Sequence, residues 1–239
     1  MRRTLFASLI LVFLALPAFS QFRTGYSELE DSDMVRTLRS HVTYLSSPEM
    51  EGRAPGSEGE KAAAGYVQSV LESYGIDILS GEEGDIFGIS RESGDTLVSR
   101  NVAGFVPGYD NSLKDRLIVV GAGLDGIGAT TLEVDGTPVT QVYAGANGNA
   151  SGLAMMLELA RMVSTNSILF RRPVLFVAFG ASTQGFAGSW YFLNRSLGSK
   201  LKIDAMVNLD MLGSGNSGFF AYTSSNPDMN MIVSQVNSD

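Results

Sequence analysis

The stretch that most constrains the fold is 117–128, LIVVGAGLDGIG, an apolar run that leads into a glycine-rich turn. An uninterrupted apolar run of this length is typical of a strand that is buried on both faces of a mainly parallel sheet. In such folds the loops at the carboxyl ends of the strands carry the chemistry. We therefore expect an α/β fold with a functional site in the loop after this strand.

The glycines of that loop fit two kinds of site. Gly121, Gly123 and Gly126 have the G-x-G-x-x-G spacing of a dinucleotide-binding turn. In that turn the last glycine opens a helix whose N-terminus binds the pyrophosphate. Residues 127–140 instead contain Pro138 and two further glycines and show no helical period. The context argues against a dinucleotide cofactor.

The rest of the chain alternates predicted helices and strands. Amphipathic helices are predicted from an N-cap at Asp33, from a capping box at Ser57 and from Ser151. Further predicted elements are a strand at 101–106, buried strands at 173–179 and 204–211, a surface excursion at 81–93, a hairpin or irregular loop at 130–143 and a helix from Pro227. No internal repeat or long linker interrupts them. This order predicts one domain, 21–239, built as a three-layer α/β sandwich with a mixed, mostly parallel central sheet.

The first twenty residues have the pattern of a secretory signal peptide. Arg2 and Arg3 precede an apolar run at 5–16, and small residues stand at 18–20. The run is too short and wrongly flanked for a membrane anchor, so we expect an exported protein, periplasmic or secreted, with no stable anchor after cleavage. The chain has no cysteine, which excludes disulfides and thiolate metal sites. Without Arg2 and Arg3, the chain has 15 basic and 25 acidic side chains. The resulting net charge of −10 argues against nucleic acid as a partner.

Two candidate clusters lie before the glycine-rich loop. His41 is the chain's single histidine and falls within the first predicted helix. With no second histidine to share a metal ion, we interpret it as a partly buried structural residue. Glu49, Glu51 and Arg53 could be a catalytic cluster, but no base or metal partner is evident. We predict for them a solvated loop with a local ion pair.

Several stretches together resemble the zinc aminopeptidases of metallopeptidase family 28, the bacterial leucyl aminopeptidases. VVGAGLDGIG, AGANGNASGLAMMLELAR, LFVAFGASTQGFAGSWYF and MVNLDMLG match four successive family blocks in order, and HVTYLSSPEMEGR resembles the opening helix and loop. The resemblance covers 41 to about 213. It implies the zinc-exopeptidase fold and a site with two zinc ions, held by histidine and carboxylates, with a glutamate as general base.

Most of the residues that carry this chemistry in the family are replaced here. The resemblance places the first ligand histidine at Gly123, a later histidine at Gly126, the bridging aspartate at Asn147 and the adjoining acid at Gly148. It places the general base at Ser182, its neighbouring zinc ligand at Thr183, an aspartate ligand at Asp210 and a supporting aspartate at Asp125. Only Asp125 and Asp210 keep the expected residue. The family's last ligand, a histidine, has no counterpart before Asp239, so the resemblance implies a domain incomplete at its C-terminal end.

These replacements predict the loss of metal and activity. Glycine offers no ligand atom, the hydroxyls are poor zinc ligands, and Asn147 offers a neutral amide in place of a bridging carboxylate. Ser182 is not basic enough to take a proton from a zinc-bound water. We expect no zinc cofactor and a pseudo-peptidase that binds a peptide or a protein partner. The alternative is a metal-dependent exopeptidase, an aminopeptidase with an atypical site.

Ser182 itself suggests one further chemistry. Gly180-Ala-Ser182 follows a predicted strand, as a nucleophilic serine does in the G-x-S-x-G elbow. Gln184 occupies the place of the final glycine, and the single histidine cannot be placed nearby from the sequence. We interpret Ser182 as a residue of a polar loop.

Overall fold

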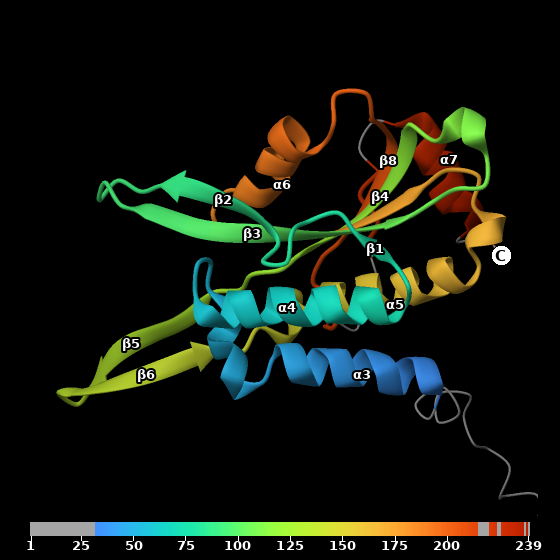
Figure 1. Ribbon diagram of the computed structural model, residues 1–239. Coiled ribbons are helices and arrows are strands. Elements are labelled where there is room, and N and C mark those ends of the chain that lie inside the picture. The colour runs from blue at the N-terminus through green and yellow to red at the C-terminus, as the bar shows by residue number, and fades with distance from the viewer. Residues whose placement is uncertain (1–31, 215–219, 224–225, 237, 239) are drawn as a thin grey trace, which may run out of the picture.

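The computed structural model describes residues 32–214, 220–223, 226–236 and 238 (Figure 1). The predicted signal peptide, 1–20, lies outside them. Among the described helices, none combines the length and the apolar character that crossing a bilayer requires.

The described part of the chain builds a mixed central sheet, as the sequence predicts. Its strands are β1 (Asp77–Ile78), β2 (Asp85–Ser90), β3 (Thr96–Val106), β4 (Arg116–Gly123), β7 (Val174–Phe179) and β8 (Lys202–Leu209). They follow the order β1-β3-β7-β4-β8, with β2 also paired to β3. β4 is parallel to β7 and to β8, whereas β3 is antiparallel to β1, β2 and β7. The carboxyl ends of β4, β7 and β8 therefore meet at one edge.

The apolar runs found in the sequence form the middle of this sheet. All six residues of β7 are buried, and β4 lies between β7 and β8. The prediction that 204–211 forms a buried strand is wrong in its burial, because in the described chain β8 pairs on one side only, with β4. Its Met206 and Val207 are 38% and 41% exposed. An apolar sequence alone did not distinguish an edge strand from a central one.

The surface excursion predicted at 81–93 is also wrong in part. Residues of β2 pair in register with the first half of β3, which begins at Thr96 and not at 101. The sequence signal for strand β2 is weak because few of its side chains are apolar and buried. Phe87 is buried and stacks on Tyr191 at a centroid distance of 5.1 Å, while Ile86 stays exposed.

Helices cover both faces of the sheet and complete the three layers (Figure 1). One face carries α3 (Asp33–Leu45), α4 (Glu58–Ser73) and α5 (Ser151–Thr165) over the larger apolar core, and the other carries α6 (Ala187–Tyr191). A smaller core on that second face joins Phe192 to β7. The last described helix is α7 (Pro227–Val236), which begins at the predicted proline.

The helix starts are nearly those predicted. The N-cap of α3 is Ser32 and not Asp33, because the Ser32 hydroxyl accepts the Val35 amide hydrogen at 3.3 Å. Ser57 caps α4 as expected, accepting from the Glu60 amide at 3.1 Å. The other half of the predicted capping box is wrong, because the Ser57 amide donates to the Ala54 carbonyl and not to Glu60. The Glu60 carboxylate instead accepts from the Gly56 amide at 2.7 Å and from the Ser99 hydroxyl at 2.6 Å. Burial raises the pKa of Glu60.

Of the two alternatives for 130–143, a hairpin or an irregular loop, the structure shows the hairpin: an arm of two strands, β5 (Gly128–Val134) and β6 (Thr137–Tyr143). Its turn places Asp135 and Gly136 at φ of 51° and 74°, the left-handed conformations that a two-residue hairpin turn requires. The arm projects from the body of the protein (Figure 1). Because a strand and not a helix follows Gly126, the structure contradicts a dinucleotide-binding turn.

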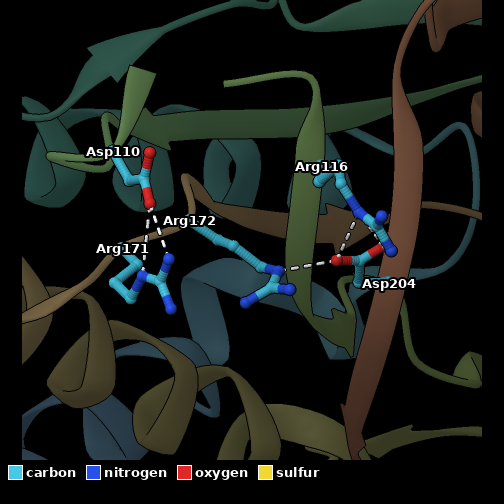
Figure 2. Close-up of polar contacts among 5 residues, drawn as sticks. All are labelled: Asp110, Arg116, Arg171, Arg172 and Asp204. Carbon is cyan, nitrogen blue, oxygen red and sulfur yellow. Dashed lines mark hydrogen bonds and ion pairs between the residues drawn. The ribbon is translucent and has the colours of Figure 1, made fainter. Parts of the chain in front are cut away.

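Ion pairs link β8 to the residues around the amino-terminal ends of β4 and β7, the ends away from the glycine-rich loop (Figure 2). The Asp204 carboxylate accepts from Arg116 on β4 at 2.9 Å and from Arg172, just before β7, at 2.6 Å. These hydrogen bonds lower the pKa of Asp204. Asp110 makes a similar pair with Arg171 at 2.8 Å.

His41 is a buried structural residue, as predicted, with 6% of its surface exposed. Its Nδ1 lies 2.7 Å from the Tyr66 hydroxyl, and its Nε2 has no hydrogen-bond partner among the described residues. Burial lowers the pKa of His41, and the Glu158 carboxylate opposes this in part. The folded protein therefore binds the proton less readily than the unfolded chain does.

This difference predicts a pH dependence of stability. Because the pKa of His41 in the folded protein lies below the unfolded value of about 6.5, the free energy of unfolding is not reduced by this residue above about pH 6.5. It falls as the pH drops below about 6.5, by up to about 1.4 kcal/mol per pH unit. Urea unfolding at pH 7.5 and 5.5 measures the loss, and His41→Gln should remove most of it. With a single histidine, its proton NMR titration is unambiguous, and a midpoint above 6.5 would contradict the prediction.

Candidate functional site

A cavity of about 500 Å³ lies at the carboxyl ends of β4, β7 and β8. The structure brings six of the predicted site residues together in its wall, from four separate blocks of sequence: Gly123, Asp125, Gly148, Ser182, Thr183 and Asp210. The remaining wall is mostly apolar and comes from Ile127, Phe179, Phe186, Met206 and Met211, with Asn149, Ser189 and Asn208 as polar members. Residues that the sequence analysis places in one site therefore lie around one cavity.

Asp125 fixes the loop that follows β7. Its side chain is 3% exposed, and its carboxylate accepts from the Ser182 amide at 2.6 Å and from the Thr183 amide at 2.9 Å. The Thr183 hydroxyl donates a third hydrogen bond at 2.7 Å. A carboxylate with three donors is well satisfied even when buried. Asp125 therefore has a structural task that needs no metal.

Arg53 lies beneath the cavity and is fully buried, so the predicted solvated loop with a local ion pair is wrong for this residue. Its guanidinium donates to the carbonyls of Leu124 at 3.2 Å, Ala144 at 3.1 Å and Gly145 at 3.0 Å, and also to that of Leu45. Burial lowers the pKa of Arg53 to about 10, and Asp125 opposes the shift. Glu49 and Glu51 are exposed, as predicted.

Through these bonds Arg53 joins the loops on both sides of the β5–β6 arm. Its own carbonyl accepts the Gly126 amide hydrogen at 2.9 Å. The sequence gives no signal for this role, because the four acceptors are backbone atoms and leave no pattern of side chains. A lone arginine in a loop rich in proline and glycine is more often exposed.

The position predicted for the bridging aspartate does not face the cavity. The Asn147 side chain donates to the Ser214 hydroxyl at 2.7 Å and accepts from the Gly213 amide at 2.8 Å, and Asn147 is not in the wall. Gly148 lines the wall in its place. At this segment the wall is therefore formed by a glycine, which offers no ligand atom.

The retained NASG segment, 149–152, has a structural explanation. The Asn149 amide donates to the Leu209 carbonyl at 2.9 Å and accepts from the Met211 amide at 2.9 Å, which ties the end of β8 to the start of α5. A side chain on Gly152 would meet the Leu209 carbonyl oxygen at 2.4 Å. Close packing of strand and helix requires these residues whatever the cavity holds.

The three glycines at family ligand positions differ in the room around them. A Cβ on Gly123 would lie 3.0 Å from the Ser182 hydroxyl, and one on Gly126 would collide with the Gly52 carbonyl at 2.5 Å. A Cβ on Gly148 would meet no atom within 4 Å. There is therefore room for a side chain at Gly148, little room at Gly123, and none at Gly126, which does not line the cavity.

The donor atoms in the cavity do not fit a pair of zinc ions. The described residues hold no cluster of three or more histidine, cysteine, aspartate or glutamate side chains that could hold a metal ion. Asp125 is engaged with three donors, which leaves Asp210 as the other carboxylate of the wall. The Ser182 hydroxyl donates to the Phe179 carbonyl at 3.0 Å, so no side-chain base is shown activating it. The nucleophile-elbow hypothesis gains no support.

The fold is that of the zinc-dependent exopeptidases. A leucine aminopeptidase precursor from Bacteroides thetaiotaomicron superposes with a TM-score of 0.65 at 20% identity, over 85% of this chain and 72% of that one. Glutaminyl cyclase from Porphyromonas gingivalis gives a TM-score of 0.66 at 19% identity, over 85% and 70% of the two chains. At these identities the similarity concerns the fold.

The sequence comparisons define the family. Peptidase family M28 matches residues 101–238, and the chain belongs to this family. Leupeptin-inactivating enzyme 1 of Streptomyces exfoliatus is 28% identical over 222 residues, which cover 91% of this chain and 44% of that enzyme. Aminopeptidase YwaD of Bacillus subtilis is 29% identical over 134 residues, 54% of this chain and 28% of YwaD. The chain thus spans less than half the length of these two relatives.

Proposed function

We propose that this chain is an exported peptidase-like domain that binds a peptide or protein segment in its cavity and does not hydrolyse it. One observation carries the proposal. The chain keeps a cavity of about 500 Å³ at the carboxyl ends of its parallel strands. The positions that the family resemblance assigns to metal ligands and base carry mostly residues that cannot do that work: Gly123, Asn147, Gly148, Ser182 and Thr183. The scaffold is kept where folding needs it, and the chemistry is replaced.

The cavity suits a peptide better than a nucleic acid or a membrane. Its wall is apolar with a few amides and hydroxyls, the usual composition of a site for a small organic ligand. The chain is acidic overall, which disfavours polyanionic partners. The names of the relatives, aminopeptidases and a leupeptin-inactivating enzyme, support peptides as the ligand class. The signal peptide pattern at 1–20 supports export.

The alternative function is a metal-dependent exopeptidase with an atypical site. Two observations favour it: the relatives named aminopeptidases, and the carboxylate of Asp210 in the cavity wall. Against it, Asp125 would have to give up hydrogen bonds from Ser182 and Thr183 to act as a ligand. A single carboxylate is a weak zinc site.

Metal content separates the two functions. We expect protein purified with added zinc and then desalted to retain less than about 0.1 zinc per chain by mass spectrometry, since structural and catalytic sites bind far more tightly. Hydrolysis of leucine p-nitroanilide should not exceed the rate without protein. Stoichiometric zinc together with hydrolysis would overturn the proposal.

Peptide binding is tested directly by isothermal titration calorimetry with a panel of short peptides. The panel varies the first residue and the state of the amino terminus. The expected result is saturable binding, with mass spectrometry showing that the recovered peptide has not been cleaved. A panel that shows no binding at all would contradict the peptide-binding role.

A further inference from the structure

The replaced residues turn the floor of the cavity into open space. Gly148 carries no side chain, and the short Ser182 and Thr183 stand where the family resemblance places the general base and its neighbouring zinc ligand. A Cβ at Gly148 meets no atom within 4 Å. Space that would otherwise hold carboxylate side chains and metal ions is therefore available to a ligand.

The walls around this floor are aromatic and sulfur-containing. Phe179 is buried at the base, and Met206 and Met211 are 38% and 57% exposed. Phe186 stands at the rim, 67% exposed. Methionine sulfur makes favourable contacts with aromatic rings and adapts to their shape, which is why methionine is common at surfaces that bind apolar side chains.

The backbone holds two of these wall residues in an unusual conformation. Phe186 and Met211 have φ of 60° and 52°, in the left-handed region that residues other than glycine adopt uncommonly. Both are anchored: the Phe186 amide donates to the Ser182 carbonyl at 3.2 Å, and the Met211 amide to Asn149 at 2.9 Å. The fold thus fixes the backbone of these two residues beside the cavity.

From these features we infer that the cavity is a socket for one large apolar side chain, preferably aromatic, of a peptide or protein partner, inserted where the family holds its metal ions. This rests on the proposed peptide-binding function and specifies its ligand. A volume of about 500 Å³ lies within the range of small-ligand pockets and admits an indole ring with its flanking backbone. Recognition of a side chain needs no free amino terminus.

The test compares three tryptophan and serine compounds. Protein-observed NMR or calorimetry should show N-acetyl-tryptophanamide binding with a Kd of about 0.1–1 mM, the range expected for a ligand of this size. N-acetyl-serinamide should bind at least about tenfold more weakly. Tryptophanamide, which has a free amine, should bind with a Kd within about threefold of that of the acetylated form. An ion pair between its ammonium group and the exposed Asp210 carboxylate would add little to the affinity.

Gly148→Leu is the blocking variant. Its backbone is not in the glycine-only region, a Cβ there meets no atom within 4 Å, and the residue lines the cavity. A leucine at this position should therefore reduce the space in the socket and weaken N-acetyl-tryptophanamide binding at least about tenfold. Gly65→Leu is the matched control: it lies on α4, also has no atom within 4 Å of its Cβ, and does not line the cavity. Its binding should stay within about twofold of the unchanged protein.

A second measurement uses the unchanged protein, so it does not depend on the folding of a variant. With methyl-labelled methionine, N-acetyl-tryptophanamide should shift the signals of Met206 and Met211 and leave those of Met34 and Met162, which do not line the cavity. Shifts confined to the latter pair would place the ligand elsewhere and overturn the inference.

The outcomes distinguish the socket from the broader function. Tryptophanamide binding more than about tenfold tighter than its acetylated form would show recognition of the amino terminus, which overturns the socket and leaves peptide binding intact. Binding of N-acetyl-serinamide as tight as that of the tryptophan compound would also overturn it. If these compounds and the peptide panel all fail to bind, the socket and the peptide-binding function fall together.

Discussion

Replacing Arg53 by methionine is expected to lower the free energy of unfolding by about 3–5 kcal/mol, the largest effect of any single side chain considered. The guanidinium is fully buried and is hydrogen-bonded to four backbone carbonyls, those of Leu45, Leu124, Ala144 and Gly145. Methionine fills much of the volume but donates nothing, so these acceptors lose a partner inside the protein. Urea unfolding followed by circular dichroism measures the loss.

Two further variants show that the effect comes from this geometry. Arg39→Met removes an arginine from the exposed side of α3 and should change stability by less than about 0.5 kcal/mol. Arg53→Lys keeps the charge but cannot spread donors across several carbonyls, so its loss should be large and somewhat smaller than that of Arg53→Met. A change below about 1 kcal/mol for Arg53→Met would contradict the bonding described.

The sequence predicted the parts of the fold that depend on local patterns. The continuous apolar runs became β4 and β7, which are buried on both faces. The cap at Ser57 and the turn at Asp135-Gly136 depend on a few adjacent residues, and both formed as predicted. The order of the family blocks located the cavity, because the carboxyl ends of parallel strands meet at one edge.

The parts that failed depend on which elements become neighbours. Whether β8 is central or at an edge depends on a second partner strand that its own residues do not specify. Arg53 was placed in solvent because its acceptors are carbonyls up to 92 positions away. That Gly148 lines the cavity and Asn147 does not follows from the backbone geometry just before α5. A match of sequence blocks does not resolve this geometry.

Asp125 and Asp210, the two family carboxylates that the chain retains, are expected to respond very differently to removal. Asp125→Ala should lower the free energy of unfolding by about 2–4 kcal/mol, because the buried amides of Ser182 and Thr183 lose their acceptor and Arg53 loses a nearby opposite charge. Asp210→Ala should change it by less than about 0.5 kcal/mol, because Asp210 is exposed. Urea unfolding of the two variants beside the unchanged protein gives both values.

The comparison tests why each carboxylate persists. If Asp125 is kept for folding, its alanine variant loses stability equally with and without added zinc, and Asp125→Asn, whose amide oxygen still accepts, recovers part of the loss. If the two carboxylates share a metal ion, added zinc stabilises the unchanged protein and either alanine variant removes that gain. The three hydrogen bonds to Asp125 favour the first result, since they account for its retention without any ligand. In that case Asp125 supports the loop after β7, and its presence in this chain needs no metal ion to explain it.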